Sequence, residues 1–412
     1  MYFRAKLFAM NNKISISSFD YNLPDDKIAS FPTDKRDRSK LLIYKNKNIS
    51  EDFFGNILNY LPTNAMLIFN DTKVVKARLN FKKPSGANIE IFCLEPTGSN
   101  DFASMFNAIN EVKWNCLVGN ARRWKEGPIE TTVNINGKDF VLTARRQAVY
   151  DDHSEILFTW NDNHTFADIL EAAGNVPLPP YIHRKTNDTD NVRYQTVYAQ
   201  HAGSVAAPTA GLHFTPELIK SLQNNGLKTE YVTLHVGLGT FKPVNEQYIS
   251  DHAMHSEIIN VPLAVIKNIA EFCDTNTIIP VGTTSCRTLE SLYWIGVMLN
   301  DNCEIHNLIT LDQWFPYNAK VQDISVKDSL FAIIKYLENN KLANLLASTQ
   351  LMITPEYKMR ICKGIITNFH QPKSTLLLLI SSFVGDDWKT IYQYALNHDF
   401  RFLSYGDGCL FL

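Results

Sequence analysis

Residues 203–217 read Gly203-Ser-Val-Ala-Ala-Pro-Thr-Ala-Gly-Leu-His-Phe-Thr-Pro-Glu217, a stretch in which only the last residue is charged. Its small residues allow the backbone to approach a ligand closely, and Gly203 and Gly211 can adopt positive φ angles that other residues avoid. Thr215-Pro-Glu217 predicts a helix start, with threonine as the N-cap and proline in the first turn. The stretch therefore predicts a tight loop that presents His213 just before a helix N-terminus, where anions are favoured. A turn with an ordinary, satisfied histidine is the alternative that these residues alone leave open.

In four further stretches, an apolar run is followed by residues of the kinds found in 203–217. Each leads into a cluster of glycine, hydroxyl, amide, histidine or cationic side chains: Phe69–Arg78, Leu234–Val244, Val281–Ser291 and Ile366–Thr375. One such junction is common at a turn, so no single stretch indicates a site. Several of them in one chain predict strand ends that converge on one pocket.

The composition is that of an ordinary globular protein. The 412 residues are 45% hydrophobic and 20% charged with a formal net charge of −2, so no overall positive field attracts the chain to nucleic acid. RNA binding would need a local basic patch, such as Arg122-Arg-Trp-Lys125, where the indole of Trp124 could stack on a base or on an arginine. Arg36–Ser39 predicts either a phosphate-binding loop or a charged turn, and a solvated face is the alternative for every such cluster. Seven scattered cysteines without a C-x-x-C pair favour reduced thiols and no zinc site.

The order of the predicted elements divides the chain into two domains. Buried strands are predicted at 65–69, 229–236 and 277–281, helices at 165–173, 217–222, 262–273, 326–337 and from Arg287 and Leu376, and a last strand at 401–404. From about Thr72 to Trp160 the pattern changes to β-branched and alternating runs, with a strong hairpin signal at Asn136-Gly137. We therefore expect an α/β (α+β) main domain formed by residues 1–72 and 160–412. Residues 73–159 are expected to form an inserted antiparallel β-barrel domain.

The N-terminus and the longest apolar runs carry no membrane signal. Met1–Met10 lacks an uninterrupted apolar segment, so no signal peptide is predicted, and Met10 is an alternative start. The run around Leu376–Ile380 is far shorter than the ~20 residues that a membrane span needs. We therefore expect no membrane role.

Taken together, these stretches resemble the S-adenosylmethionine:tRNA ribosyltransferase-isomerase family of queuosine biosynthesis. The resemblance runs from about Phe19 to the C-terminus, and further matches follow in the family's order: Asp20-Tyr-Asn-Leu-Pro24, Arg36-Asp-Arg-Ser-Lys-Leu-Leu42, Pro177-Leu-Pro-Pro-Tyr-Ile182, Tyr194-Gln-Thr-Val-Tyr198 and Ser404-Tyr-Gly-Asp407. The resemblance implies that the ribosyl group of S-adenosylmethionine is transferred to 7-aminomethyl-7-deazaguanine at the tRNA wobble position and isomerised. The products would be epoxyqueuosine-tRNA, adenine and methionine. It further implies a cytoplasmic monomer with S-adenosylmethionine as co-substrate and no metal or other cofactor.

The implied reaction suggests roles for residues of these stretches. A base must take a proton next to the sulfonium and an acid must assist the departure of adenine. His213 and His370 are expected to do so, because imidazole titrates near neutral pH, and Asp407 is an alternative base or an orienting group. Arg287 and the Gly282 turn are expected to hold the methionine carboxylate. The other expected substrate-binding residues are Asn70, Asp71 and Arg78, for the ribose or the deazaguanine, and Thr209, Gly211, Thr283, Thr284, Asn368 and Lys373.

Two features depart from the family's pattern. Residues 292–350 form a longer link than the family usually has, and could serve RNA docking, a partner or a changed substrate. Lys363 replaces an expected aspartate, and Lys40 and Lys242 replace expected arginines, although lysine lacks the planar fork of arginine. Two alternatives therefore stay open: a non-catalytic RNA-binding relative, and a ribosyl transferase that uses a non-tRNA acceptor.

Overall fold

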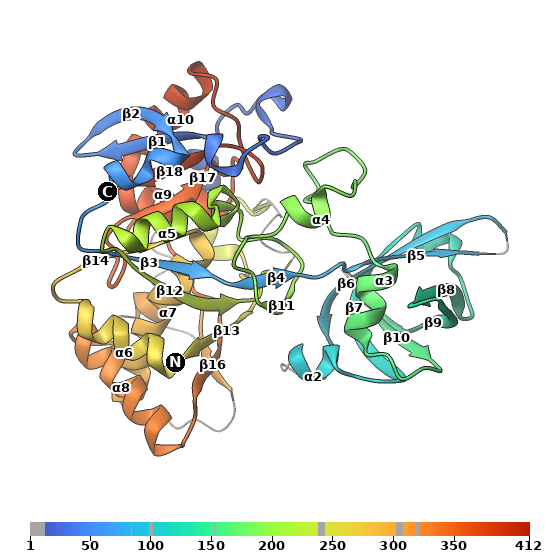
Figure 1. Cartoon of the computed structure of the whole chain (residues 1–412). Helices are drawn as coiled ribbons and strands as arrows, with labels where there is room; N and C mark the ends of the chain where they lie inside the picture. Colours follow the sequence, from blue (N-terminus) through green and yellow to red (C-terminus); the bar gives the residue numbers. More distant parts are fainter. Residues whose placement is uncertain are drawn as a thin grey trace.

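The computed structural model describes residues 13–83, 85–98, 102–151, 153–237, 244–301, 308–318 and 321–412. These residues form a mixed α/β body and a β-barrel that projects from one side of it (Figure 1). The expected combination of an α/β part with an antiparallel barrel is therefore confirmed.

A six-stranded mixed sheet forms the centre of the α/β body. Its order is β14 (Thr277–Pro280), β3 (Ala65–Asn70), β12 (Lys228–Leu234), β13 (Glu257–Pro262), β16 (Asn344–Thr349) and β15 (Ile309–Leu311). The first three strands run parallel to one another, and every residue of β3 is buried. The α/β body also contains α5 (Pro216–Asn224), α6 (Leu263–Phe272), α7 (Thr283–Asn300) and α8 (Val326–Asn339) (Figure 1). The parallel strands direct their carboxyl ends, and the loops that follow them, to one edge.

A second sheet, which contains the C-terminal strands of the chain, adjoins the same edge of the central sheet. Its order is β17 (Ile365–Asn368), β18 (Gly408–Phe411), β1 (Lys40–Lys45) and β2 (Asn48–Phe53). A parallel bridge between Val281 and Ile366 joins it to the central sheet just beyond β14. After β17 the chain enters α9 (Thr375–Val384) and α10 (Trp388–Asn397), and Ser374 caps α9 as predicted.

The barrel is a six-stranded antiparallel sheet with its own apolar core. Its order is β5 (Arg78–Lys82), β6 (Asn88–Pro96), β7 (Glu111–Gly119), β10 (Ser154–Trp160), β9 (Lys138–Val149) and β8 (Ile129–Ile135), and the edge strands β5 and β8 approach each other. Asn136 and Gly137 have φ angles of 53° and 83°, so the hairpin prediction is confirmed. Alongside lie α2 (Phe102–Phe106) and α3 (Phe166–Ala173). Strand β4 (Thr72–Val74) pairs with β11 (His201–Ser204) and not with the barrel.

Short 3₁₀ segments and one helical turn complete the described chain. They are η1 (Ile16–Phe19), η2 (Asp25–Lys27), η3 (Arg36–Arg38), η4 (Phe54–Asn59), η5 (Ala121–Arg123), α4 (Asp190–Arg193), η6 (Thr209–His213), η8 (Ile249–Asp251), η9 (Phe315–Tyr317) and η10 (Gly385–Asp387).

Two predicted boundaries are wrong. Helix α7 begins at Thr283 and not at Arg287, because Gly282, with φ 92°, turns the chain directly into the helix. The last strand is β18, and Asp407 precedes it. Residues 401–404 leave the extended conformation because Leu403 has φ 69° and its carbonyl oxygen accepts a hydrogen bond from the Gly406 N–H.

Of the two stacking partners predicted for Trp124, an RNA base or an arginine, the structure shows the arginine. Its indole is buried in the barrel, with the Arg146 guanidinium 4.6 Å from the ring centre. A base could stack on this ring only if the arginine moved away, so an exposed aromatic platform is absent from this basic cluster.

The described part of residues 292–350 is built into the α/β body. Helix α8 packs on α7 at Gly296, where an added Cβ would lie 2.2 Å from the Ser329 carbonyl oxygen. Strand β16 pairs with β13 on one side and β15 on the other. The predicted helix at 326–337 is confirmed, and the described part of this link forms a layer of the main fold.

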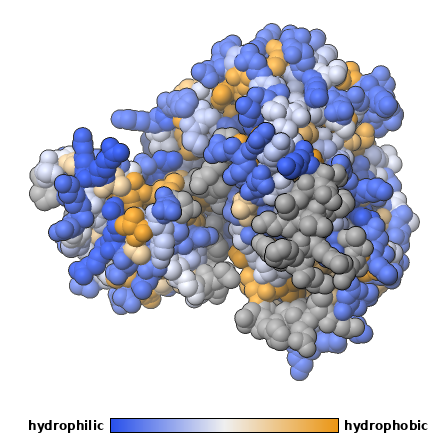
Figure 2. All heavy atoms as spheres, turned by 180° about the vertical axis from the view of Figure 1, so that it is seen from behind, coloured by the Kyte–Doolittle hydropathy of each residue, from blue (hydrophilic) through white to orange (hydrophobic). Residues whose placement is uncertain are grey.

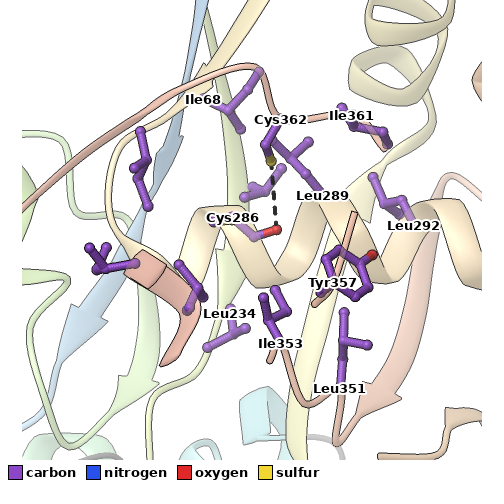
Figure 3. Close-up of a cluster of buried hydrophobic side chains, with 14 of the residues drawn as sticks. Ile68, Leu234, Cys286, Leu289, Leu292, Leu351, Ile353, Tyr357, Ile361 and Cys362 are labelled. Atoms are coloured by element: carbon purple, nitrogen blue, oxygen red, sulfur yellow. Dashed lines mark hydrogen bonds between the residues drawn. The ribbon is translucent and has the colours of Figure 1, made fainter. Parts of the chain in front are cut away.

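Helix α7 lies in the interior of the α/β body. All of its first fifteen residues are buried, and Leu289 and Leu292 pack against the segments that carry Ile353 and Ile361 (Figure 3). Seen from behind, the surface is mostly hydrophilic with small groups of apolar atoms (Figure 2). Among the described residues, the helices are all too short or too polar to cross a membrane.

Candidate active site

A pocket that is open to solvent, with about 660 Å³ of empty space when the solvent at its mouth is included, lies where the two sheets of the α/β body meet. Four short segments supply most of its wall, namely residues 206–210, 282–284, 367–371 and 403–404. Val236 and Ser374 also line it, so four of the five stretches singled out in the sequence meet here. The N-terminal ends of α7 and α9 both face this pocket, and the helix dipole at each end favours an anion there.

The fifth stretch, Phe69–Arg78, does not line the pocket but contacts a residue of its wall. Asn70 is fully buried at the end of β3, and its amide donates to Thr284 Oγ1 at 3.2 Å and to the Leu234 carbonyl at 3.0 Å. Its Oδ1 accepts from the Leu234 and Thr72 N–H groups, so the whole side chain is engaged. Asn70 therefore positions Thr284 and does not itself line the pocket.

Asp71 points to the other side of the strand, as alternation requires. It accepts a hydrogen bond from Thr233 Oγ1 at 2.7 Å, and His201 Nε2 lies 3.6 Å from its second oxygen. Burial raises the pKa of the Asp71 carboxyl, while Thr233 and His201 oppose that rise. The structure thus separates Asn70 from Asp71, which sequence reasoning had grouped.

His213 ends η6 and is buried behind the pocket wall. Its Nδ1 lies 2.8 Å from Ser39 Oγ, its Nε2 lies 3.2 Å from Asn368 Nδ2, and Phe54 stacks on its ring. An amide nitrogen can only donate, so Nε2 accepts and Nδ1 carries the proton toward Ser39. His213 lines a separate 250 Å³ pocket with Arg36 and Tyr405, and reaches the main pocket through Asn368.

His370 lines the main pocket directly. Its Nε2 lies 2.9 Å from Thr367 Oγ1, and its backbone is fixed by the hydroxyls of Tyr392 and Tyr21. These three contacts hold the imidazole on the loop between β17 and α9. Of the two predicted proton-transfer histidines, His370 is therefore the one that a substrate in this pocket would touch.

The expected titration of both histidines near neutral pH is wrong for the unliganded protein. Burial lowers the pKa of His213 to about 3, with further lowering by the charges of Arg401 and Arg36, while the contact with Asn368 opposes it. Burial alone lowers the pKa of His370 to about 3. Both rings are neutral at pH 7, so each can accept a proton, but neither is an imidazolium acid before substrate binds.

Two other predicted residues have structural partners outside the pocket. Asp407 is buried, accepts from the Lys40 and Arg401 N–H groups and pairs with the Arg401 side chain. Lys373 adopts φ 53° and pairs with Asp20 at 2.9 Å. The structure does not place either at the pocket wall.

Arg78 and Gly211 also differ from the prediction. Arg78 lies on barrel strand β5, where it pairs with Glu90 at 2.8 Å and stacks on Phe92. Gly211 has no positive φ, and an added Cβ would lie 2.0 Å from the Tyr198 hydroxyl oxygen. Gly211 is therefore a packing glycine and not a ligand contact.

The remaining predicted residues lie in or beside the pocket. Thr209, Thr283, Thr284 and Asn368 line it. Arg287, one turn into α7, lines a smaller adjoining pocket and forms a buried ion pair with Glu257. Lys242 falls outside the described residues.

Sequence reasoning missed several polar groups at the site. Ser39 holds His213, Thr367 holds His370, and Ser404 bonds to the Tyr181 hydroxyl at 2.6 Å in the pocket wall. All lie in or next to stretches that the sequence had marked. Their side-chain directions depend on tertiary contacts, so no local signal distinguished them from ordinary turn residues.

Comparison with known proteins agrees with this arrangement. The family model described as "Queuosine biosynthesis protein" matches residues 16–411. The S-adenosylmethionine:tRNA ribosyltransferase-isomerase of Halothermothrix orenii is 36% identical over 97% of this chain and 100% of its own length. The protein of the same name from Thermosipho africanus is also 36% identical, over 96% and 99%.

A solved structure is also similar. The crystal structure of S-adenosylmethionine tRNA ribosyltransferase from Thermotoga maritima is 26% identical and covers 96% of this chain and 100% of its own, with a TM-score of 0.46. The family match spans both the barrel and the residues that line the pocket. The chain belongs to the queuosine biosynthesis family of S-adenosylmethionine:tRNA ribosyltransferase-isomerases.

Proposed function

We propose that this enzyme transfers the ribosyl group of S-adenosylmethionine to 7-aminomethyl-7-deazaguanine at the wobble position of tRNA. A proton leaves the carbon next to the sulfonium, and the aminomethyl nitrogen of the deazaguanine forms a C–N bond with the ribosyl group and loses a proton. The bond to adenine breaks and adenine takes up one proton, while the C–S bond breaks and methionine departs as the thioether. The transferred ribosyl group is isomerised, and the product is epoxyqueuosine-tRNA. S-adenosylmethionine is the co-substrate.

The observation that carries this proposal is the convergence of the family's stretches on one pocket. Asn368 is 2% exposed and its Oδ1 has no hydrogen-bond partner among the described residues, although Asn368 forms part of the pocket wall. A buried acceptor without a partner costs about 1–3 kcal/mol, which a ligand donor would offset. Ribose hydroxyls and the adenine amino group are donors of this kind.

The geometry supports different roles for the two histidines. His370 lines the pocket, and its neutral ring can accept the proton from the carbon next to the sulfonium, although the low pKa that burial gives it makes it a weak base. His213 is a positioning residue, because it acts through Asn368. Thr209, Thr283 and Thr284 offer hydroxyls to the substrate.

We further propose that the chain works as two domains. The barrel of residues 73–159 is one, and residues 1–72 and 160–412 form the other, which contains the pocket. Asp407, Asn70 and Arg36 then stabilise the pocket from outside it.

The direct test is incubation with S-adenosylmethionine and tRNA that bears 7-aminomethyl-7-deazaguanine, followed by measurement of free adenine and of the mass of the modified base. We expect stoichiometric adenine and the epoxyqueuosine mass. His370→Ala should reduce adenine release at least 100-fold while folding is kept. His183→Ala is the matched control, because His183 is exposed and does not line the pocket.

Three results would change the conclusion. Near-normal adenine release by His370→Ala would remove His370 as the base. Adenine release without a change in the tRNA would favour a non-tRNA acceptor. Tight tRNA binding without adenine release, from folded protein, would favour an RNA-binding relative.

A further inference from the structure

Phe31 is an exposed aromatic side chain on the surface of the α/β body. Its exposed fraction is 55%, although the Arg184 guanidinium covers one face of the ring at 4.1 Å from the ring centre. The opposite face of the ring is therefore open to solvent. An exposed aromatic ring backed by an arginine is a surface on which a nucleic-acid base can stack.

Neighbouring residues hold the ring and its arginine in place. Arg184 donates two hydrogen bonds to the carboxylate of Asp190, both at 2.7 Å, and its Nε donates to the Ser30 carbonyl at 2.8 Å. Asp190 is itself buried and accepts a further hydrogen bond from the Tyr405 hydroxyl at 2.9 Å. Because these contacts already hold the guanidinium against the ring, a base that stacks on Phe31 has little further ordering to impose.

Phe31 lies beside the candidate active site. Pro32, the next residue, and Ser404 line the separate 250 Å³ pocket, and Ser404 also lines the main pocket. Tyr181, another residue of the main pocket wall, precedes Arg184 by three positions. The Cα atoms of Tyr181 and Arg184 are therefore at most ~11 Å apart. A nucleotide next to the one that enters the main pocket can thus reach Phe31.

The two segments around Phe31 and Arg184 are more basic than the chain as a whole. Residues 30–38 and 183–193 contain six lysines and arginines against four aspartates, whereas the whole chain has a net charge of −2. Lys35 and Lys185 are exposed and have no ion-pair partner in the part of the chain that the structure describes. An open aromatic face with unpaired lysines nearby fits single-stranded RNA, whose phosphates the lysines can bind.

We propose that Phe31 stacks on an unpaired tRNA base that neighbours the wobble base, while Lys35 and Lys185 contact the adjoining phosphates. The inference rests on the proposed function, because that function supplies the tRNA. A base that enters an enzyme pocket leaves its stack, so its neighbour loses a stacking partner. The Phe31 ring replaces that partner and offsets part of the cost of unstacking. Phe31 thus binds the tRNA and takes no part in the chemistry.

The test measures binding of the full-length protein to tRNA that bears 7-aminomethyl-7-deazaguanine. Phe31→Ala should raise the Kd for this tRNA, and its KM in adenine release, by about 5- to 100-fold. The KM for S-adenosylmethionine and kcat, both at saturating tRNA, should stay unchanged. Phe31→Trp should bind the tRNA as tightly as the unmodified protein, whereas Phe31→Leu, which is apolar but cannot stack, should bind as weakly as Phe31→Ala. Phe331→Ala is the matched control, because Phe331 is 50% exposed on α8 and lines neither pocket.

A fluorescent base tests the stacking directly. 2-Aminopurine, whose fluorescence is quenched by stacking, is placed in the tRNA on either side of the wobble base. At one of these two positions, the bound tRNA should be dimmer with the unmodified protein than with Phe31→Leu. Lys35→Gln and Lys185→Gln should each lower the slope of log Kd against log salt concentration by about 1.

Each result either supports or overturns the stacking contact. Unchanged tRNA binding in folded Phe31→Ala, full binding by Phe31→Leu, or equal fluorescence at both positions would overturn it. If Phe31→Ala does not fold, the comparison of Phe31→Trp with Phe31→Leu still decides. Loss of self-association in Phe31→Ala with unchanged tRNA binding would assign the surface to a protein contact instead. Phe31-dependent tRNA binding without adenine release would reject the proposed function and keep the stacking contact, and normal adenine release with Phe31-independent binding would do the reverse.

Discussion

Nδ2 of Asn368 lies 3.2 Å from Nε2 of His213, and so links a buried imidazole to the wall of the main pocket. The same nitrogen lies 3.2 Å from the Leu403 carbonyl oxygen. Turning the amide over would bring Oδ1 against that oxygen, so the carbonyl fixes the orientation of the side chain. Oδ1 of Asn368 is therefore kept in a position where it can accept a hydrogen bond from the ligand.

Replacing Asn368 with alanine should lower kcat/KM for adenine release by about 10- to 100-fold. The change removes the acceptor and leaves Nε2 of His213 without its donor. Steady-state kinetics with saturating tRNA would measure this. Asn64→Ala serves as the control, since Asn64 is exposed and bonds only to Thr275 and Thr277. Equal activity of the two variants would show that Asn368 has no part in binding or positioning.

Stability should fall as the pH drops below about 6.5. The folded-state pKa values of His213 and His370 are both about 3, so the unfolded chain binds protons that the folded chain does not. The contribution of each neutral ring is complete above the unfolded pKa of about 6.5 and decreases between 6.5 and 3. From pH 7 to pH 5 we expect a loss of about 1–2 kcal/mol per histidine.

Urea denaturation at pH 5, 6 and 7 would measure this loss. His370→Gln should show a smaller decrease between pH 7 and 5 than the unmodified protein. His183→Gln should match the unmodified protein, because that histidine is exposed. A pH dependence that His370→Gln leaves unchanged would mean that this ring protonates freely in the folded state.

The sequence predicted most elements because their signals are local. The buried run of β3, the Thr215 cap of α5 and the Asn136-Gly137 hairpin each depend on a few neighbouring residues. The start of α7 was misplaced because Gly282 could equally end a turn or begin a helix. The last strand was misplaced because the positive φ of Leu403 is imposed by tertiary contacts.

The sequence predicted which stretches form the site, but not which of their side chains contact one another. Asn70 and Asp71 are adjacent in sequence and both buried, yet Asn70 bonds to Thr284 in the pocket wall whereas Asp71 bonds to Thr233. The pKa values of His213 and His370 could not be predicted from the sequence either. Their residue type suggested titration near neutral pH, whereas their burial, which only the fold reveals, lowers both pKa values.

Arg36→Lys should lower the free energy of unfolding by about 2 kcal/mol. The Arg36 guanidinium donates to the carbonyls of Val192, Gln195 and Leu212, while Arg193 donates to those of Thr33 and Asp34. Lysine cannot bridge several carbonyls at once, so the 192–195 segment should loosen.

Thermal unfolding and limited proteolysis would detect that change. We expect faster cleavage near residue 193 in Arg36→Lys than in Arg38→Lys, whose side chain is exposed on the same segment. If Arg36 instead serves only to hold an RNA phosphate, Arg36→Lys would keep its stability and weaken tRNA binding.

Gly296→Ala should lower the free energy of unfolding by about 1–3 kcal/mol, although alanine is the better helix former. The reason is the close approach of α8, where the added Cβ would lie 2.2 Å from both the carbonyl oxygen and the hydroxyl of Ser329. Urea denaturation would measure the loss. Gly237→Ala is the control, since an added Cβ there meets none of the described residues within 4 Å. Adding Ser329→Ala should not restore stability, because the backbone oxygen stays in place. Full rescue by that second change would show that only the hydroxyl limits the packing of α8 on α7.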